Sequence, residues 1–269
     1  MNQLTTGRQV RLACGSGFNI GPTPSFAPYH IQANLVILHE SEANDFKQFC
    51  SYNPAPLPVL EVLPPGAWST KIAASDSDIR YDVGTYLIWK NGELLEERKE
   101  IKTLWQNDFV TFLIGCSFSF DAALIAHGIP VRHVEGRSNS PMFITDIETK
   151  PSGKFHGPLV VSMRPMRPEQ VPLARSITNA YPLLHGSPIH SGDATAIGIK
   201  DIRRPDFGDE VEIRSDEIPV FWACGVTAQL ALIKSTIGFA VTHKPGHMYV
   251  TDLTISDLAV SDLEIGNLK

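Results

Sequence analysis

Two loops and a tight turn in the second half of the chain concentrate side chains that can carry protons. Histidine titrates near neutral pH and a neighbouring aspartate can orient it, so such residues are candidates for general acid/base catalysis. The predicted catalytic residues are His185, His190, Asp193, Asp209 and His243. For a single histidine, a structural role in tying its loop together is about equally favoured, but two histidine pairs together favour catalysis.

The pair His243 and His247 has the four-residue separation that places two metal ligands on one face of a helix. Pro245 and Gly246 lie between them and disfavour that helix. A metal site built from both histidine loops is the weaker alternative, because no spacing here is diagnostic of one. The sequence also has no Walker loop and no Rossmann fingerprint. We therefore predict neither a metal nor a cofactor.

Arginines supply a second kind of chemistry. Arg132 and Arg164 each lie at an apolar segment that reads as a strand. A guanidinium at the end of a strand can reach a cleft and bind a carboxylate through two parallel hydrogen bonds. The predicted ligand is therefore a small carboxylate, with His247 contributing to its binding. An ion pair on the surface or between lobes is the alternative for either arginine.

Two segments about a hundred residues apart, 112–121 and 220–229, read almost alike. Each is an apolar run typical of a buried strand, followed by a small residue, a cysteine and a predicted helix. Cys116 and Cys224 would then lie where unpartnered backbone N–H groups attract negative charge and lower the pKa of a thiol. With Ser117 and Gly225 they form a predicted anion-binding site that opens on one shared cleft. The alternative is that both cysteines are small hydrophobic core residues.

The elements that must position these residues predict an α/β protein. We expect a larger mixed α/β domain made of residues 1–127 and 183–269, with a smaller two-layer α+β lobe, residues 128–182, inserted in it. Within that lobe, strands are predicted over 131–135, 142–147 and 159–163, and a helix over 169–181.

Composition excludes several classes of function. The chain has 269 residues and a net charge of −6, and its pI is near 5.8. Nucleic acids and anionic membranes call for a basic face, so we predict no nucleic-acid partner and no membrane partner. The four cysteines include no C-x-x-C pair, which favours a reducing cytoplasm. The sequence leaves open whether the chain forms a homo-oligomer.

Six ordered segments resemble the signature blocks of the D-glutamate cyclase family. They are residues 115–120, 160–165, 185–193, 205–209, 219–227 and 242–248. The resemblance implies a cytoplasmic hydro-lyase that removes water from D-glutamate to give 5-oxo-D-proline. Ile144 stands where the family pattern has an arginine. The alternative substrate is therefore another small amino or hydroxy acid.

The residues suit such a ring closure by general acid/base catalysis without a cofactor. An arginine suits the α-carboxylate, His185 or His190 suits deprotonation of the ammonium group, and an aspartate suits orientation or protonation. Backbone N–H groups at the two cysteine turns suit the oxyanion that forms. From another class, a carboxylate-binding sensor would need only the arginines, whereas the histidine and aspartate loops favour an enzyme.

Overall fold

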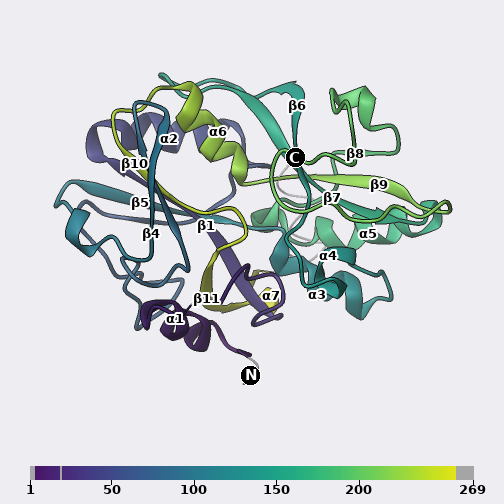
Figure 1. Ribbon diagram of the computed structural model, residues 1–269, viewed down its shortest axis with the longest axis horizontal. Coiled ribbons are helices and arrows are strands. Elements are labelled where there is room, and N and C mark those ends of the chain that lie inside the picture. The colour runs from purple at the N-terminus through teal and green to yellow at the C-terminus, as the bar shows by residue number, and fades with distance from the viewer. Residues whose placement is uncertain (1–3, 19, 259–269) are drawn as a thin grey trace.

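The computed structural model describes residues 4–18 and 20–258 and contains two antiparallel sheets that lie side by side along the longest axis (Figure 1). The larger sheet has the strand order β2-β5-β1-β10-β3-β4, and β11 pairs with β1. Its strands are β1 (His30–His39), β2 (Val59–Leu63), β3 (Tyr86–Lys90), β4 (Glu93–Arg98), β5 (Phe109–Gly115), β10 (Ala240–His243) and β11 (Tyr249–Thr254). Residues from both ends of the chain therefore build one sheet.

The smaller sheet has the order β6-β7-β9-β8. Its strands are β6 (Met142–Glu148), β7 (Pro158–Met166), β8 (His190–Ser191) and β9 (Ile218–Ala223). The mixed α/β class is confirmed, as are the strands predicted at 142–147 and 159–163. The division at residues 128 and 182 stays a prediction, although the smaller sheet also takes β8 and β9 from beyond it.

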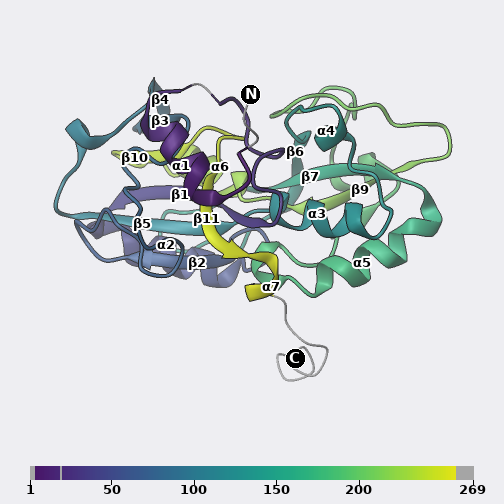
Figure 2. The ribbon, with the colours of Figure 1, turned by 90° about the horizontal axis from the view of Figure 1, so that it is seen from below.

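Helices cover both sheets (Figure 2). They are α1 (Gly7–Gly15), α2 (Glu40–Tyr52), α3 (Phe118–Ala126), α4 (Arg132–Glu135), α5 (Val171–Asn179), α6 (Val226–Lys234) and α7 (Ile255–Leu258). Short 3-10 turns occupy Lys102–Leu104, Pro168–Gln170, Pro182–Leu184 and Ala194–Ile197. Among the described residues, no helix has the length and apolar composition needed to cross a membrane.

The strand predicted over 131–135 is wrong, because Arg132–Glu135 forms the short helix α4. The segment has only a few residues between Pro130 and Gly136, and none of the described strands pairs with it. Its carbonyls close a turn instead: Val134 and Glu135 both donate their N–H groups to the carbonyl of Val131. Arg132 therefore does not lie at a strand end.

Strand β1 runs through the middle of the larger sheet and is buried on both faces. Its alternating residues feed two separate clusters, Val36 and Leu38 on one side and Leu35 and Ile37 on the other. Each fully buried side chain of this size contributes about 1.5–3 kcal/mol of hydrophobic stabilisation. This double burial explains the continuous apolar run in the sequence, which a strand exposed on one face would interrupt with polar residues.

The two helices that follow β5 and β9 each pack partly on the other sheet. Helix α3 leaves the larger sheet, but its Phe120 and Leu124 pack with Trp222 of the smaller sheet. Helix α6 leaves the smaller sheet, but its Ala231 and Leu232 pack in the cluster that covers the larger sheet. The two crossings bring both strand-to-helix turns to the junction between the sheets.

Candidate active site

The two cysteine turns have the same backbone geometry. Cys116 and Ser117 connect β5 to α3, and Cys224 and Gly225 connect β9 to α6, so the predicted strand-to-helix positions are confirmed. The residue before each helix has nearly the same torsion angles, with φ −62° and ψ −20° at Ser117 and φ −65° and ψ −15° at Gly225. Neither of these two residues' N–H groups has a hydrogen-bond partner in the described part of the chain.

Asn34 joins the two turns. Its Nδ2 donates to the carbonyl of Gly115 at 2.9 Å, immediately before the first turn. The same amide packs against the second turn so closely that a Cβ on Gly225 would lie 2.1 Å from Nδ2. Glycine is therefore required at position 225, and the two turns are neighbours across one buried side chain.

The thiols differ from the prediction. Cys116 and Cys224 are free and buried. Burial raises the pKa of the Cys116 thiol well above its ordinary value, although the N–H of Phe118 lowers it slightly. Burial also raises the pKa of the Cys224 thiol to about 11. The predicted lowering of the thiol pKa is therefore wrong, because the helix ends do not offset the loss of water. Both thiols are neutral core groups at physiological pH.

Arg164 lies fully buried beside the first turn and is held by three side chains. Its Nε donates to Asp121 Oδ1 at 2.7 Å, and Nη1 and Nη2 donate to the hydroxyls of Ser162 and Ser117, each at 3.1 Å. Its guanidinium also lies over the rings of Phe120 and Trp222, at 5.0 and 5.3 Å from their centroids. The arginine predicted to bind substrate is thus committed to a buried network at the junction.

His133 completes this network. Its Nε2 lies 3.0 Å from Asp121 Oδ2, so Asp121 accepts from an arginine on one oxygen and a histidine on the other. Burial opposes ionisation of Asp121, but the Arg164 charge and the His133 hydrogen bond keep its pKa below the ordinary value. Burial lowers the pKa of His133, which therefore stays a neutral donor. The cluster carries one positive and one negative charge.

His185 is the one predicted catalytic histidine that lies beside this network. It has a left-handed backbone conformation, with φ 81°, and only 3% of its surface is exposed. Its Nδ1 donates to the carbonyl of Ala55 at 2.7 Å, which leaves Nε2 as a bare acceptor. That Nε2 is buried without a hydrogen-bond partner. Burial, aided by the charge of Arg164, lowers the pKa of His185 to about 4.

The loop that follows β10 reaches the same junction. Pro245 accepts from Asn139 Nδ2 at 3.3 Å, and Met248 packs in one cluster with Cys116 and Phe118. The hydrogen bonds of its two histidines, His243 and His247, do not assign either of them a role. His243 Nδ1 is 3.1 Å from the backbone N–H of Leu35, which donates to it, while His243 Nε2 and His247 Nδ1 are buried without partners. Burial lowers the pKa of both histidines to about 4.

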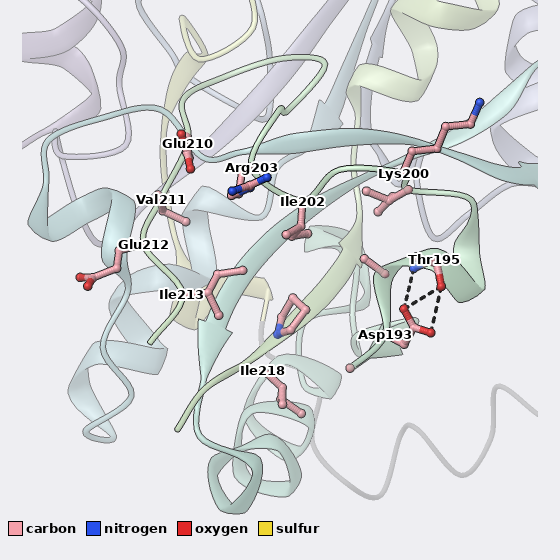
Figure 3. Close-up of a pocket in the computed structure, with 14 residues that line it drawn as sticks. Asp193, Thr195, Lys200, Ile202, Arg203, Glu210, Val211, Glu212, Ile213 and Ile218 are labelled. Carbon is pink, nitrogen blue, oxygen red and sulfur yellow. Dashed lines mark hydrogen bonds between the residues drawn. The ribbon is translucent and has the colours of Figure 1, made fainter. Parts of the chain in front are cut away.

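His190 and Asp193 lie elsewhere. His190 is paired in register with Phe221, whereas Arg164 is paired with Val220, so the two side chains lie on opposite faces of the smaller sheet. His190 Nε2 contacts the carbonyl of Asp193, and Asp193 accepts from Thr195. Asp193 lines a separate cavity of about 740 Å³ on that face (Figure 3). The structure does not bring these residues to the cysteine turns.

Arg132 and Asp209 each link two segments of the chain through a polar contact. Arg132 forms an ion pair with Glu217 through Nη2, as the ion-pair alternative predicts. Asp209 is exposed, and its Oδ2 accepts from the N–H of Asn139 at 2.8 Å. Among the described residues, no three His, Cys, Asp or Glu side chains are grouped closely enough to hold a metal ion. The buried candidates are therefore His185 and the network around Arg164.

Comparison with known proteins identifies the family. The model of the family described as D-glutamate cyclase matches residues 110–252, more than half of the chain. The chain belongs to the D-glutamate cyclase family. A relative from Bordetella pertussis is 51% identical and aligns over 92% of this chain and 89% of its own length. A relative from Rubrobacter xylanophilus is 50% identical, over 88% and 91% respectively. Both carry the name "Putative hydro-lyase".

A solved structure gives a weaker match. A nitrogen repressor-like protein from Methanococcus jannaschii aligns over 91% of this chain and 98% of its own, with a TM-score of 0.38 and 9% identity. A likeness at this level informs neither the activity nor the site. Family membership therefore rests on sequence, and the site rests on the contacts described above.

Four residues at the junction of this D-glutamate cyclase family member were not among the predicted site residues. They are Asn34, Asp121, His133 and Ser162. Three had a signal in the sequence. Asp121 follows Ser117 by four residues, one helical turn, and Ser162 precedes Arg164 by two, on the same face of a strand. Asn34 is a polar residue within an apolar strand, which also marks it for attention.

Proposed function

We propose that this protein is a hydro-lyase that cyclises D-glutamate to 5-oxo-D-proline. The amine nitrogen attacks the side-chain carboxyl carbon, a C–N bond forms, a C–O bond breaks and water leaves. Family membership supports the reaction class. The observation that carries the proposal is the neutral, buried His185, whose Nε2 accepts no hydrogen bond from the described residues and lies near the charge of Arg164.

His185 suits the removal of a proton from the substrate ammonium group. Its Nδ1–H is held by Ala55, so the lone pair on Nε2 is oriented before substrate arrives. A pKa of about 4 is low for a base at neutral pH. A substrate carboxylate within about 4–6 Å favours the protonated imidazole and raises that pKa. Substrate binding therefore makes His185 a stronger base.

The two cysteine turns suit the carboxyl groups and the oxyanion. Ser117 and Gly225 each offer an unpartnered N–H at the start of a nine-residue helix, where negative charge is stabilised. The ring closure is intramolecular, so proximity favours it once the substrate is folded between the turns. Arg164 stabilises negative charge at the first turn through its hydrogen bond to Ser117. Its guanidinium nitrogens already donate to Asp121, Ser162 and Ser117, so it does not bind the substrate directly.

The test is product formation by the purified protein. D-glutamate should lose one water and give 5-oxoproline, followed by mass spectrometry, whereas L-glutamate should react much more slowly. His185→Gln should lower kcat by about 10²–10⁴-fold, the range for loss of a general base. The matched control is His190→Gln, on the other face of the smaller sheet, which should keep the wild-type rate.

The same assay separates the alternatives. A panel of small 2-amino and 2-hydroxy acids would reveal a different dehydratase by loss of water from another member. A protein that binds D-glutamate in calorimetry but never forms product would be a sensor. Equal kcat values for wild type and His185→Gln would contradict the assignment of the base.

A further inference from the structure

The hydroxyls of Ser117 and Ser162 share an unusual environment. Both are buried, at 2% and 1% exposure, and both accept a hydrogen bond from Arg164 at 3.1 Å. The two oxygens lie 3.4 Å apart, so one hydroxyl donates to the other. Arginine has only donors, so neither serine can give its own proton to Arg164.

Among the hydrogen bonds of Ser117, Ser162 and Arg164, one serine hydroxyl proton has no acceptor in the described part of the chain. A serine hydroxyl has one O–H and two lone pairs. One of the two hydroxyl protons is used between Ser117 and Ser162, and the other has no acceptor among the residues that the structure describes. Leaving such a group unpaired when it is buried destabilises the folded protein. The pair therefore calls for an acceptor from outside the chain.

Position decides which hydroxyl carries the free proton. Ser162 lies within β7, with neighbouring strands on both sides. Ser117 lies in the turn itself, and its own backbone N–H has no partner among the described residues. When Ser162 donates to Ser117, the two lone pairs of Ser117 are filled by Ser162 and Arg164, and its O–H must point away from both.

We propose that the Ser117 hydroxyl donates a hydrogen bond to the reacting carboxyl group of the substrate, and that Ser162 is the positioning residue that fixes its direction. This inference rests on the proposed cyclisation. In the tetrahedral intermediate the carboxyl oxygen gains negative charge, and a donor already aimed at it stabilises that charge without reorganisation. The Asp121–Arg164 ion pair and the aromatic rings around it hold the donor in place.

Ser119 provides a matched control in the same helix. It is equally buried, but its Oγ accepts from the N–H of Gln32 at 2.8 Å and donates to the carbonyl of Gln32 at 3.4 Å. Its hydroxyl proton is therefore already donated to an acceptor within the protein. Ser119→Ala removes a buried hydroxyl without removing one that is available to substrate.

The experiment measures kcat and KM for D-glutamate in the wild type and in Ser117→Ala, Ser162→Ala, Ser162→Thr and Ser119→Ala. Loss of one oxyanion donor lowers kcat by about 10²–10³-fold, so we expect this for Ser117→Ala with little change in KM. Ser162→Ala should lower kcat by a smaller factor, and Ser162→Thr should restore it because the hydroxyl returns. Ser119→Ala should lower the melting temperature but keep kcat.

Circular dichroism establishes that each variant is folded, and the pH profile adds a second readout. Because serine does not titrate in the working range, Ser117→Ala should lower the whole profile without moving its inflections. A folded Ser117→Ala with wild-type kcat would overturn this inference while leaving the proposed function intact. A wild type that forms no 5-oxoproline would overturn both.

Discussion

Acid should unfold this protein partly through His185, and the size of the effect follows from its burial. A pKa lowered from 6.5 in the unfolded chain to about 4 in the folded protein corresponds to about 3 kcal/mol. Below pH 6.5 the unfolded chain binds a proton that the folded protein does not, so the free energy of unfolding decreases as the pH decreases. The contribution is fully present above pH 6.5 and is lost as the pH falls toward 4.

His185→Gln removes this titration while keeping a donor for Ala55. Urea unfolding of wild type and variant across this window gives the difference in slope, which we expect to be up to about 1.4 kcal/mol per pH unit. Asp82 acts in the opposite direction, because burial raises its pKa to about 7, but it is common to both proteins and cancels. Ser119→Ala, which lowers stability without removing a titrating group, should keep the wild-type slope. Parallel pH curves for wild type and His185→Gln would refute the argument.

Three other outcomes follow from the junction. Arg164→Ala leaves Asp121 buried without its cation and should cost about 3–5 kcal/mol in urea unfolding, whereas an effect below 1 kcal/mol would contradict the network. Gly225→Ala forces a Cβ within 2.1 Å of Asn34 and should cost about 1–3 kcal/mol, with a loss that Asn34→Ala partly relieves in a double-mutant cycle. Thiol reagents at pH 8 should leave Cys224 unmodified in the native protein and label it in urea, because burial raises its pKa to about 11.

The sequence was most informative where backbone geometry repeats. The likeness of segments 112–121 and 220–229 correctly predicted two strand-to-helix turns, because each strand is largely buried and a small residue, Ser117 or Gly225, precedes each helix. The packing of each helix on the other sheet was not predictable. It depends on which apolar face packs against which, and both helices are apolar enough to pack on either sheet.

The positions of the loop residues could not be predicted from the sequence, for a different reason. His185 and His190 are five residues apart in one Gly/Pro-rich segment, and nothing periodic in a loop says which side of a sheet a residue will meet. Only the register of β8 with β9 separates His190 from Arg164. Arg132 illustrates the same limit, because so short a segment beside a proline reads equally well as a strand or a turn of helix.

The two turns are alike in backbone and unlike in chemistry, and this difference bears on the kind of ligand between them. Ser117 carries a hydroxyl that Arg164 holds, whereas Gly225 carries no side chain because Asn34 occupies that space. One turn thus offers a side-chain donor and a backbone N–H, and the other offers a backbone N–H alone. A symmetric pair of equal anion sites would suit a symmetric ligand. Unequal turns beside one histidine acceptor suit a molecule in which one carboxyl group reacts and the other is only held.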